Sequence, residues 1–513
     1  MSEVPPQSAP PGARESLVRR AGVALVWAQL AKLLEVALST AIGLIAIRAL
    51  GPDGFGSFAF LTNLFLVLSA FIPFATAEAF GVIVPRFARR DERLFVLVLL
   101  AGLRLLVVLA VYAALAAAWV AVRDVFGMGA VTLDLFLLAG VYWLALDVMN
   151  TVAGFFLANL DSRPVALWRM VGLSLALAGM VAIALLGRTT VGSVFASVAV
   201  GNALGVAGLV LHLGRRSEGL APIGRERVRG LWSMTASIWA GTMLASALST
   251  QVDALLIGAV TSNPREVAFF AAALAVLGRA QLLFFAGWSA SVMPTLGEAL
   301  ATRGRDGFVR AWEVAGKLFA LVSLPVNGFA IVLGPPLVVL AFGDVYEPAG
   351  GLLAWLAVFG IAYTLVGGPL GASGLWVLGL QGQVLRVRVV GAAAHVALAV
   401  LLIARYQALG AVIASGVVLM GTGAIELGLL RRAAPVRPPA TFTARVLAAT
   451  AVAVAPAVAI RADDAPELVA ASLVGIAVFV AALAVARPFT APDLDALSRF
   501  SPRAERIAGR FAR

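Results

Sequence analysis

Long apolar runs separated by short polar turns fill almost the whole chain. A helix that crosses a bilayer needs about 20 mostly apolar residues, and fourteen segments satisfy this condition. The predicted spans are 20–48, 56–85, 94–121, 131–158, 163–187, 190–213, 230–260, 266–296, 308–333, 349–378, 385–404, 408–430, 442–460 and 467–486. The pattern predicts an all-α polytopic membrane protein with about 14 transmembrane helices.

The sixth and the twelfth predicted spans begin with similar motifs. Gly192–Ser197 reads GSVFAS and Gly410–Ser415 reads GAVIAS, and each motif is followed after about twenty residues by a pair of arginines. The motifs and the arginine pairs recur at nearly the same offset along the chain, which indicates an internal repeat. Many transporters are built from such repeats. We therefore expect two pseudo-symmetric six-helix bundles and two additional C-terminal helices.

This symmetry divides the sequence into seven regions. They are an N-terminal cytoplasmic tail (1–19), an N-terminal six-helix bundle (20–213), a basic cytoplasmic linker (214–229), a C-terminal six-helix bundle (230–430), a second linker (431–441), transmembrane helices 13 and 14 (442–486) and a basic cytoplasmic tail (487–513).

The basic residues orient the predicted spans. With the N-terminus placed in the cytoplasm, most of the 39 lysines and arginines fall in cytoplasmic segments, Arg163 and Arg169 among them. The opposite side holds Arg48, Arg123, Arg188, Arg265, Arg405 and Arg461. Because cytoplasmic loops are enriched in lysine and arginine, we expect both termini in the cytoplasm and the protein in the cytoplasmic (inner) membrane.

Composition agrees with a membrane protein and excludes several kinds of chemistry. Of the 513 residues, 61% are hydrophobic and 13% are charged, whereas soluble domains carry about 25% charged residues. The net charge of +12 lies in short loops, where it suits an anionic leaflet better than a nucleic acid. With no cysteine and two histidines, we expect neither disulfides nor a metal or other cofactor. Short loops leave no room for an extramembrane catalytic domain, so we do not expect an enzyme.

Two predicted spans carry polar stripes at helical spacing. The stripe of the first span holds Gln29, Lys32, Glu35 and Ser39, and the stripe of the seventh holds Thr242, Ser246 and Asp253. Because these spans occupy equivalent positions in the repeat, the stripes predict a hydrated cavity. The alternative is helix packing through small residues, with Lys32 and Glu35 forming a local ion pair.

Four cations fall inside the predicted spans, namely Lys32, Arg104, Arg279 and Lys317. A charge within the bilayer usually faces a cavity or a partner, and arginine suits phosphate well. Each cation is therefore a candidate contact for a ligand phosphate, with Gln281 beside Arg279 in the cavity lining. The in-span carboxylates Glu35, Glu78, Asp147 and Asp253 could pair with these cations or bind a coupling ion. His395 is expected to be a packing histidine.

Three short motifs carry a resemblance that covers essentially the whole chain. Leu50–Gly56 (LGPDGFG) follows the first span, Phe342–Ala349 (FGDVYEPA) precedes the tenth, and Pro85–Arg89 (PRFAR) ends the second. Together they resemble the polysaccharide transporters, the oligosaccharide flippase branch of the multidrug/oligosaccharidyl-lipid/polysaccharide exporter superfamily.

The resemblance implies a V-shaped pair of bundles, with the first, second, seventh and eighth spans lining a central cavity. It implies that alternating access moves an isoprenoid-diphosphate-linked oligosaccharide from the cytoplasmic to the outer leaflet, for O-antigen, capsule or exopolysaccharide synthesis. Lys32 and Arg279 lie on lining spans, so the resemblance implies that they bind the diphosphate. Arg104 and Lys317 lie on other spans. The implied partners are membrane lipid and polysaccharide assembly proteins around a monomer, and a proton or sodium gradient could drive transport.

Three alternatives remain. A cation-coupled multidrug exporter of the same superfamily shares the architecture but is disfavoured by the loop motifs. A lipid II flippase shares it too, but the arginine pattern of those flippases is not evident, because Lys32 is the only central cation of the first span. A membrane enzyme is disfavoured because the acidic residues expected on the outer face are scattered over short loops.

Overall fold

The computed structural model describes residues 11–73, 79–80, 83–87, 89–129, 131–159, 161–215, 219–460, 464–490, 493, 509 and 511. Within these ranges, residues 11–31, 85, 225, 282–291 and several positions between 233 and 247 are described by their backbone alone. Eleven of the helices in the described ranges are long and apolar enough to cross a membrane. The protein is therefore an all-α, multi-pass membrane protein.

Two long helices each contain a glycine break, which accounts for two of the three segments by which the fourteen predicted segments exceed the eleven helices. Helix α1 (Pro11–Phe71) is interrupted at Gly51, with φ 63°, and α10 (Pro264–Phe342) at Gly304, with φ 62°. Glycine adopts positive φ without a Cβ penalty, and Pro52 then suits the first turn of the next helical arm. Each of these helices therefore holds residues of two predicted spans.

Three predicted spans differ in detail from the helices. The span predicted at 56–85 is too long, because α1 ends at Phe71 and the short helix η1 (Val84–Arg86) follows further along the chain. The span at 230–260 is divided between α8 (Arg225–Ala247) and α9 (Thr250–Thr261). The span at 349–378 is divided between α11 (Glu347–Leu365) and α12 (Leu370–Val377), because Gly367 and Gly368 take positive φ.

The chain forms two compact units. The first comprises Met1–Ala49, Phe65–Val122 and Val131–Met243, and the second comprises Leu50–Leu64, Arg123–Ala130 and Leu244–Arg513. The division after Met243 falls inside α8, later than the predicted basic linker 214–229. The segment that follows Gly51 is assigned to the second unit although it lies early in the sequence.

Helices of the first unit pack through small residues. They include α3 (Arg90–Ala117), α5 (Leu133–Ala158), α6 (Ser162–Leu185) and α7 (Val191–Gly214), with the short α4 (Trp119–Val125) following α3. A Cβ on Gly172 would lie 2.7 Å from the Gly201 carbonyl oxygen. Such close backbone approach is typical of helices that associate within a bilayer. It holds α6 against α7 and fixes the positions of polar side chains on α6.

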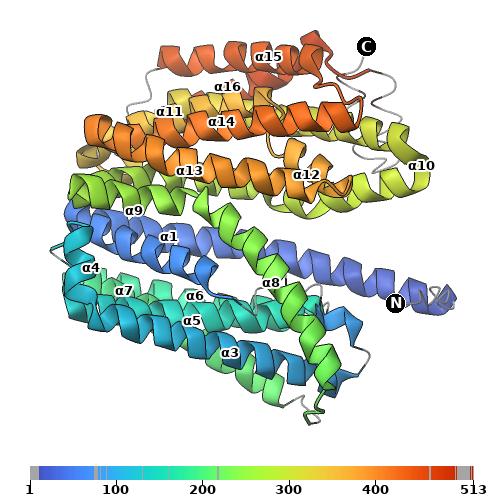
Figure 1. Ribbon diagram of the computed structural model, residues 1–513. Helices are drawn as coiled ribbons and strands as arrows, with labels where there is room; N and C mark the ends of the chain where they lie inside the picture. The colour runs from blue at the N-terminus through green and yellow to red at the C-terminus, as the bar shows by residue number, and fades with distance from the viewer. Residues whose placement is uncertain are drawn as a thin grey trace. The chain divides into compact units, whose positions relative to one another are not determined.

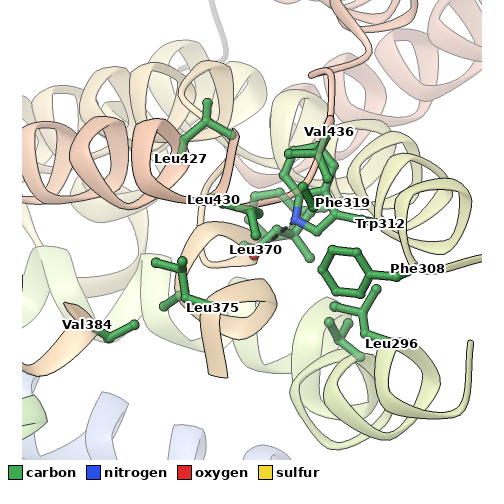
Figure 2. Close-up of a cluster of buried hydrophobic side chains, with 13 residues drawn as sticks. Leu296, Phe308, Trp312, Phe319, Leu370, Leu375, Val384, Leu427, Leu430 and Val436 are labelled. Carbon is green, nitrogen blue, oxygen red and sulfur yellow. Dashed lines mark hydrogen bonds between the residues drawn. The ribbon is translucent and has the colours of Figure 1, made fainter. Parts of the chain in front are cut away.

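The second unit contains α9 to α16, including α13 (Gln381–Tyr406), α14 (Ala408–Ala433), α15 (Ala440–Ile460) and α16 (Ala465–Ala486). Helix α13 packs against α14, and α15 packs against both α16 and α10 (Figure 1). One core cluster is centred on Trp312, whose indole Nε1 donates to the Leu370 carbonyl oxygen at 3.0 Å (Figure 2). Burying this aromatic ring and satisfying its N–H ties α10 to α12.

Candidate functional site

A partly exposed group of charges lies in the first unit, on α1 and α6. The Lys32 Nζ lies 3.3 Å from Glu35 Oε1, and the Arg169 Nη1 lies 3.6 Å from Glu35 Oε2. Arg169 also donates from Nη2 to Asn150 Oδ1 at 2.7 Å. The side chains of Lys32, Glu35 and Arg169 are 38%, 22% and 26% exposed. We call these four residues the cationic cluster.

Local helix geometry produces the cationic cluster. Lys32 and Glu35 are three residues apart on α1, so their side chains project from the same face. Arg169 lies two turns into α6, and Asn150 on α5 orients its guanidinium. The positive-inside count placed Arg169 among the cytoplasmic residues, although the predicted span 163–187 already included it. Its depth within that span is the signal that could have identified it.

The chemistry of the cluster favours an anionic ligand. Two cations share one carboxylate, which leaves a formal charge of +1 and several N–H donors. Arginine and lysine bind phosphate oxygens through charge-assisted hydrogen bonds, and partial burial strengthens them relative to bulk water. The prediction that Lys32 and Glu35 form a local ion pair agrees with the geometry, and Arg169 adds a second cation to that pair.

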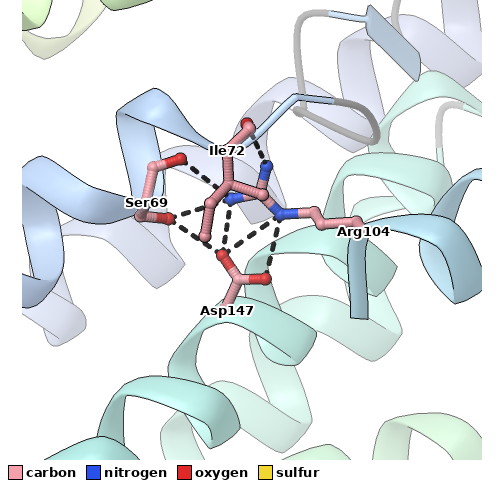
Figure 3. Close-up of polar contacts among 4 residues, drawn as sticks. All are labelled: Ser69, Ile72, Arg104 and Asp147. Carbon is pink, nitrogen blue, oxygen red and sulfur yellow. Dashed lines mark hydrogen bonds and ion pairs between the residues drawn. The ribbon is translucent and has the colours of Figure 1, made fainter. Parts of the chain in front are cut away.

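Arg104 has protein partners on all sides. Its guanidinium donates from Nη2 to Asp147 Oδ1 at 2.6 Å and from Nε to Asp147 Oδ2 at 2.9 Å (Figure 3). It also donates to the Ile72 carbonyl oxygen at 3.1 Å and to Ser69 Oγ at 2.9 Å. Arg104 and Asp147 are 5% and 6% exposed. A diphosphate at Arg104 would have to displace this carboxylate, so the structure gives the pair a place in the packing of α1, α3 and α5.

Lys317 also pairs with a carboxylate. Its Nζ contacts Asp493, which follows α16 near the end of the described chain. Asp493 accepts further hydrogen bonds from the backbone N–H and the hydroxyl of Thr490. This contact fastens the segment after α16 to α10.

The remaining predicted site residues lie on helices of both units. Arg279 and Gln281 lie on α10 in the second unit, and both are half-buried. Ser39 donates to the Val36 carbonyl of its own helix at 3.3 Å, and Ser246 is half-buried on α8. Glu78 and the side chains of Gln29 and Thr242 lie outside the described residues.

Asp253 belongs to a buried polar cluster in the second unit. Its Oδ1 lies 2.8 Å from Nε2 of His395, and its Oδ2 accepts a hydrogen bond of 2.5 Å from the Ser415 hydroxyl. Asp253 is 0% exposed and His395 1% exposed. His395, expected to be a packing histidine, is buried as expected but contacts a carboxylate on α9. The part of the chain that the structure describes contains no group of three or more metal-ligating side chains.

Two of the loop motifs have packing roles in the second unit. A Cβ on Gly56 would lie 1.9 Å from the Pro264 carbonyl oxygen, so this position admits only glycine without a backbone shift. Tyr346 is 1% exposed, and its ring meets that of Phe342 at a centroid distance of 5.8 Å in an edge-to-face arrangement. These contacts give physical reasons for the glycines and aromatics in Leu50–Gly56 and Phe342–Ala349.

An apolar groove of about 460 Å³ lies between α10 and α16. Its lining includes Val276, Leu277, Phe329, Ile476 and Phe479. Polar atoms contribute little to this lining, so the groove suits an alkyl or isoprenoid chain rather than a sugar.

Comparison with solved structures identifies the fold. No protein-family model matches the sequence, and neither does any curated protein. The structure is similar to "Lipid II flippase MurJ, inward closed conformation", with a TM-score of 0.67 and 12% identity over 90% of this chain and 98% of that one. It is also similar to an inward-facing multidrug resistance MATE family transporter of the MOP superfamily, with a TM-score of 0.61 and 16% identity over 78% and 98% of the two chains. A MATE structure in the bent conformation matches with a TM-score of 0.53 and 16% identity over 80% and 95%. The chain therefore has the all-α polytopic fold of MurJ-type and MATE-type transporters.

Proposed function

We propose that this protein is a flippase that moves an isoprenoid-diphosphate-linked oligosaccharide from the cytoplasmic to the outer leaflet of the inner membrane by alternating access. The observation that carries the proposal is the cationic cluster, in which Lys32 and Arg169 share Glu35 and keep a net positive charge on membrane helices. A diphosphate supplies the anionic oxygens that such a cluster binds. Similarity to a protein named as a lipid II flippase adds support from the fold.

The lipid part of the substrate has a matching surface. The groove between α10 and α16 is lined mainly by aliphatic and aromatic side chains. Because an isoprenoid tail stays in the bilayer, van der Waals packing rather than transfer from water would hold it on such a surface. The proposed product would serve the synthesis of a cell-surface polysaccharide.

A flip assay tests the proposal. Full-length protein in proteoliposomes would be given a fluorescent isoprenoid-diphosphate oligosaccharide, and its transfer between leaflets would be followed by quenching from one side. Arg169→Gln and Lys32→Gln each remove one charge-assisted contact of about 1.5–3 kcal/mol, so the flip rate at low substrate should fall about tenfold or more. Arg215→Gln is the matched control, because it removes an exposed cation of the same unit. Equal rates in the wild type and both cluster variants would contradict the proposal.

A multidrug exporter is the second candidate, because a MATE transporter has a similar fold. A cationic drug would be repelled by the positive charge at Lys32 and Arg169. In the same liposomes, transport of a cationic dye without transfer of the lipid would favour the exporter. Transfer of a peptide-bearing lipid diphosphate in preference to the oligosaccharide form would favour a lipid II flippase.

A further inference from the structure

An apolar groove of about 430 Å³ lies between α1 and α6, within the first unit. We call it the α1–α6 groove. Its lining consists of Leu38 of α1 and six residues of α6, namely Ser174, Leu177, Ala178, Val181, Ala182 and Leu185. Because an α-helix rises about 1.5 Å per residue, the α6 side of this groove is about 17 Å long.

The cationic cluster lies at one end of the α1–α6 groove. On α1, Glu35 precedes Leu38 by one turn, and on α6, Arg169 precedes Ser174 by five residues. The contact between Glu35 and Arg169 therefore comes before the groove lining on both helices, which run in the same direction here. Lys32, one turn before Glu35, lies at the same end. The cluster and the groove thus form one surface that is cationic at one end and apolar along the rest.

Packing against α7 fixes the α6 wall of the groove. The Ser197 hydroxyl of α7 donates to the Ala176 carbonyl oxygen at 2.9 Å, and a Cβ on Gly179 would lie 2.4 Å from Ser197 Oγ. Ala176 is buried on this face, whereas Ala178 and Ala182 are exposed. Protein therefore covers one face of α6 and leaves the groove face open to a ligand.

The relief of the groove suits a methyl-branched chain. Residues four apart on a helix are neighbours on its surface, so Ser174, Ala178 and Ala182 form a row of small side chains. A parallel row of larger side chains is formed by Leu177, Val181 and Leu185. Methyl branches can enter the hollows over the small side chains, where close van der Waals contact is the main attraction available in a bilayer. An unbranched chain would leave these hollows unfilled.

The charge and shape of this surface match the head of an isoprenoid diphosphate. In such a lipid the diphosphate is bonded directly to the first isoprene unit, so the anion and the branched apolar chain adjoin. In a phospholipid, a glycerol and two ester groups separate the phosphate from the chains. The side chains of the groove offer those polar groups only the Ser174 hydroxyl. Because a polar group that is buried without a hydrogen bond is costly, a phospholipid fits this surface less well.

We propose that the α1–α6 groove binds the isoprene units nearest the diphosphate, while Lys32 and Arg169 hold the diphosphate itself. The site deepens the proposed function, on which it rests, because it names the surface that recognises the lipid carrier. It also gives the two grooves different parts of the chain. The described residues that line the groove between α10 and α16 include no cation, so that groove takes isoprene units further from the diphosphate.

Calorimetric titration of the purified full-length protein tests the site with three soluble probes, farnesyl diphosphate, dodecyl diphosphate and inorganic diphosphate. The farnesyl and dodecyl main chains are equal in length, but only the farnesyl chain carries methyl branches. The wild type should bind farnesyl diphosphate several-fold tighter than either of the other probes. Equal affinity for the farnesyl and dodecyl probes would indicate a site for unbranched chains, such as those of a phospholipid, and would overturn the proposal.

Two substitutions on α6 separate the groove from its surroundings. Ala178→Phe fills the groove, so farnesyl diphosphate should bind about fivefold weaker or more. Its affinity for inorganic diphosphate should stay unchanged, which shows that the cationic cluster is intact. Ala184→Phe is the matched control, because Ala184 is exposed on the same helix but does not line the groove. Farnesyl diphosphate affinity that is equal in the wild type and Ala178→Phe, or equal losses in both variants, would overturn the proposal.

A smaller substitution provides a second test that adds no bulk to the helix. Val181→Ala removes part of the row of larger side chains, so it should reduce the preference for farnesyl over dodecyl diphosphate. A preference that is unchanged in this variant would overturn the match between the groove and a branched chain.

The flip assay distinguishes failure of this site from failure of the proposed function. Ala178→Phe should slow transfer of the lipid several-fold, and Ala184→Phe should leave the rate unchanged. Wild-type flipping together with farnesyl binding that ignores Ala178→Phe would overturn the site but leave the flippase proposal standing. Absence of flipping by the wild type would refute the proposed function, and the titrations would still decide the site.

Discussion

Asp53 and Arg265 form a bidentate ion pair between positions 212 residues apart. Both carboxylate oxygens of Asp53 lie 2.9 Å from guanidinium nitrogens of Arg265, within the second unit. These hydrogen bonds hold the pKa of Asp53 below its ordinary value. The pair is well exposed, and exposed pairs contribute only about 0–1 kcal/mol. Its main effect is therefore to orient the segment after Gly51 on the start of α10.

The close contact between Gly56 and Pro264 should matter more for stability than this ion pair. Gly56→Ala would drive a methyl group into the Pro264 carbonyl oxygen, 1.9 Å away. Overpacking against a rigid backbone costs about 1–3 kcal/mol, so we expect a clear fall in the thermal unfolding midpoint in detergent. Gly43→Ala is the matched control on the same helix, because nothing lies within 4 Å of its Cβ position. That variant should be neutral or more stable by up to about 1 kcal/mol; equal losses in both would contradict the argument.

Breaking the Arg104–Asp147 pair should destabilise the first unit strongly. Arg104→Gln leaves a buried carboxylate without its counter-charge, and losing one partner of a buried pair costs about 3–5 kcal/mol. Thermal or denaturant unfolding of the purified protein measures this loss. Arg265→Gln serves as the exposed-pair control and should cost less than about 1 kcal/mol. The double variant Arg104→Met/Asp147→Leu should recover much of the stability, whereas a loss equal to the sum of both single variants would contradict this assignment.

Removing Glu35 should strengthen anion binding at the cationic cluster. Glu35→Gln raises the formal charge shared by Lys32, Arg169 and residue 35 from +1 to +2. One charge at about 4 Å is worth about 1 kcal/mol in bulk water and more at a partly buried site, so a soluble isoprenoid diphosphate should bind at least about fivefold tighter. Calorimetric titration at fixed ionic strength provides the measurement. Glu226→Gln, an exposed acid of the same unit, should leave the dissociation constant unchanged, and weaker binding by Glu35→Gln would place the anion elsewhere.

Acid should weaken the contact between Asp493 and Lys317 that holds the segment after α16 against α10. Burial opposes ionisation of this carboxyl, but hydrogen bonds from Lys317 and Thr490 outweigh it and hold the pKa of Asp493 below its ordinary value. A carboxyl with a lowered folded-state pKa stabilises the fold above its ordinary pKa of about 3.9, and that stability is lost as the pH falls through the folded value. Hydrogen exchange of residues 487–490, corrected for intrinsic rates, should accelerate below about pH 4. In the Asp493→Asn variant, hydrogen exchange of this segment should already be fast at pH 7. Slow exchange in that variant would contradict the prediction.

Sequence alone determined the helical architecture, because a chain in lipid must satisfy its backbone hydrogen bonds within each segment. An apolar run of sufficient length therefore becomes a helix whatever its neighbours are. The predicted spans 131–158, 163–187 and 408–430 match α5, α6 and α14 to within a few residues. Gly51 and Pro52 also indicated a turn there. The end of α1 at Phe71 had a signal too, since a residue before a proline disfavours helical conformation and Pro73 follows Ile72, but the predicted span 56–85 ran through it.

Only the tertiary structure decided what each charged side chain does. Arg104, Arg169 and His395 are all polar interruptions of apolar helices, and nothing in their local sequence distinguishes them. Their partners, Asp147, Glu35 and Asp253, lie on other helices, and the choice depends on which faces meet when the helices pack. Packing therefore buries Arg104 in a closed network, leaves Arg169 in a partly exposed cluster and places His395 against a carboxylate. The reason is physical: helix formation in a membrane is local, whereas the pairing of charges is decided by contacts far apart in the chain.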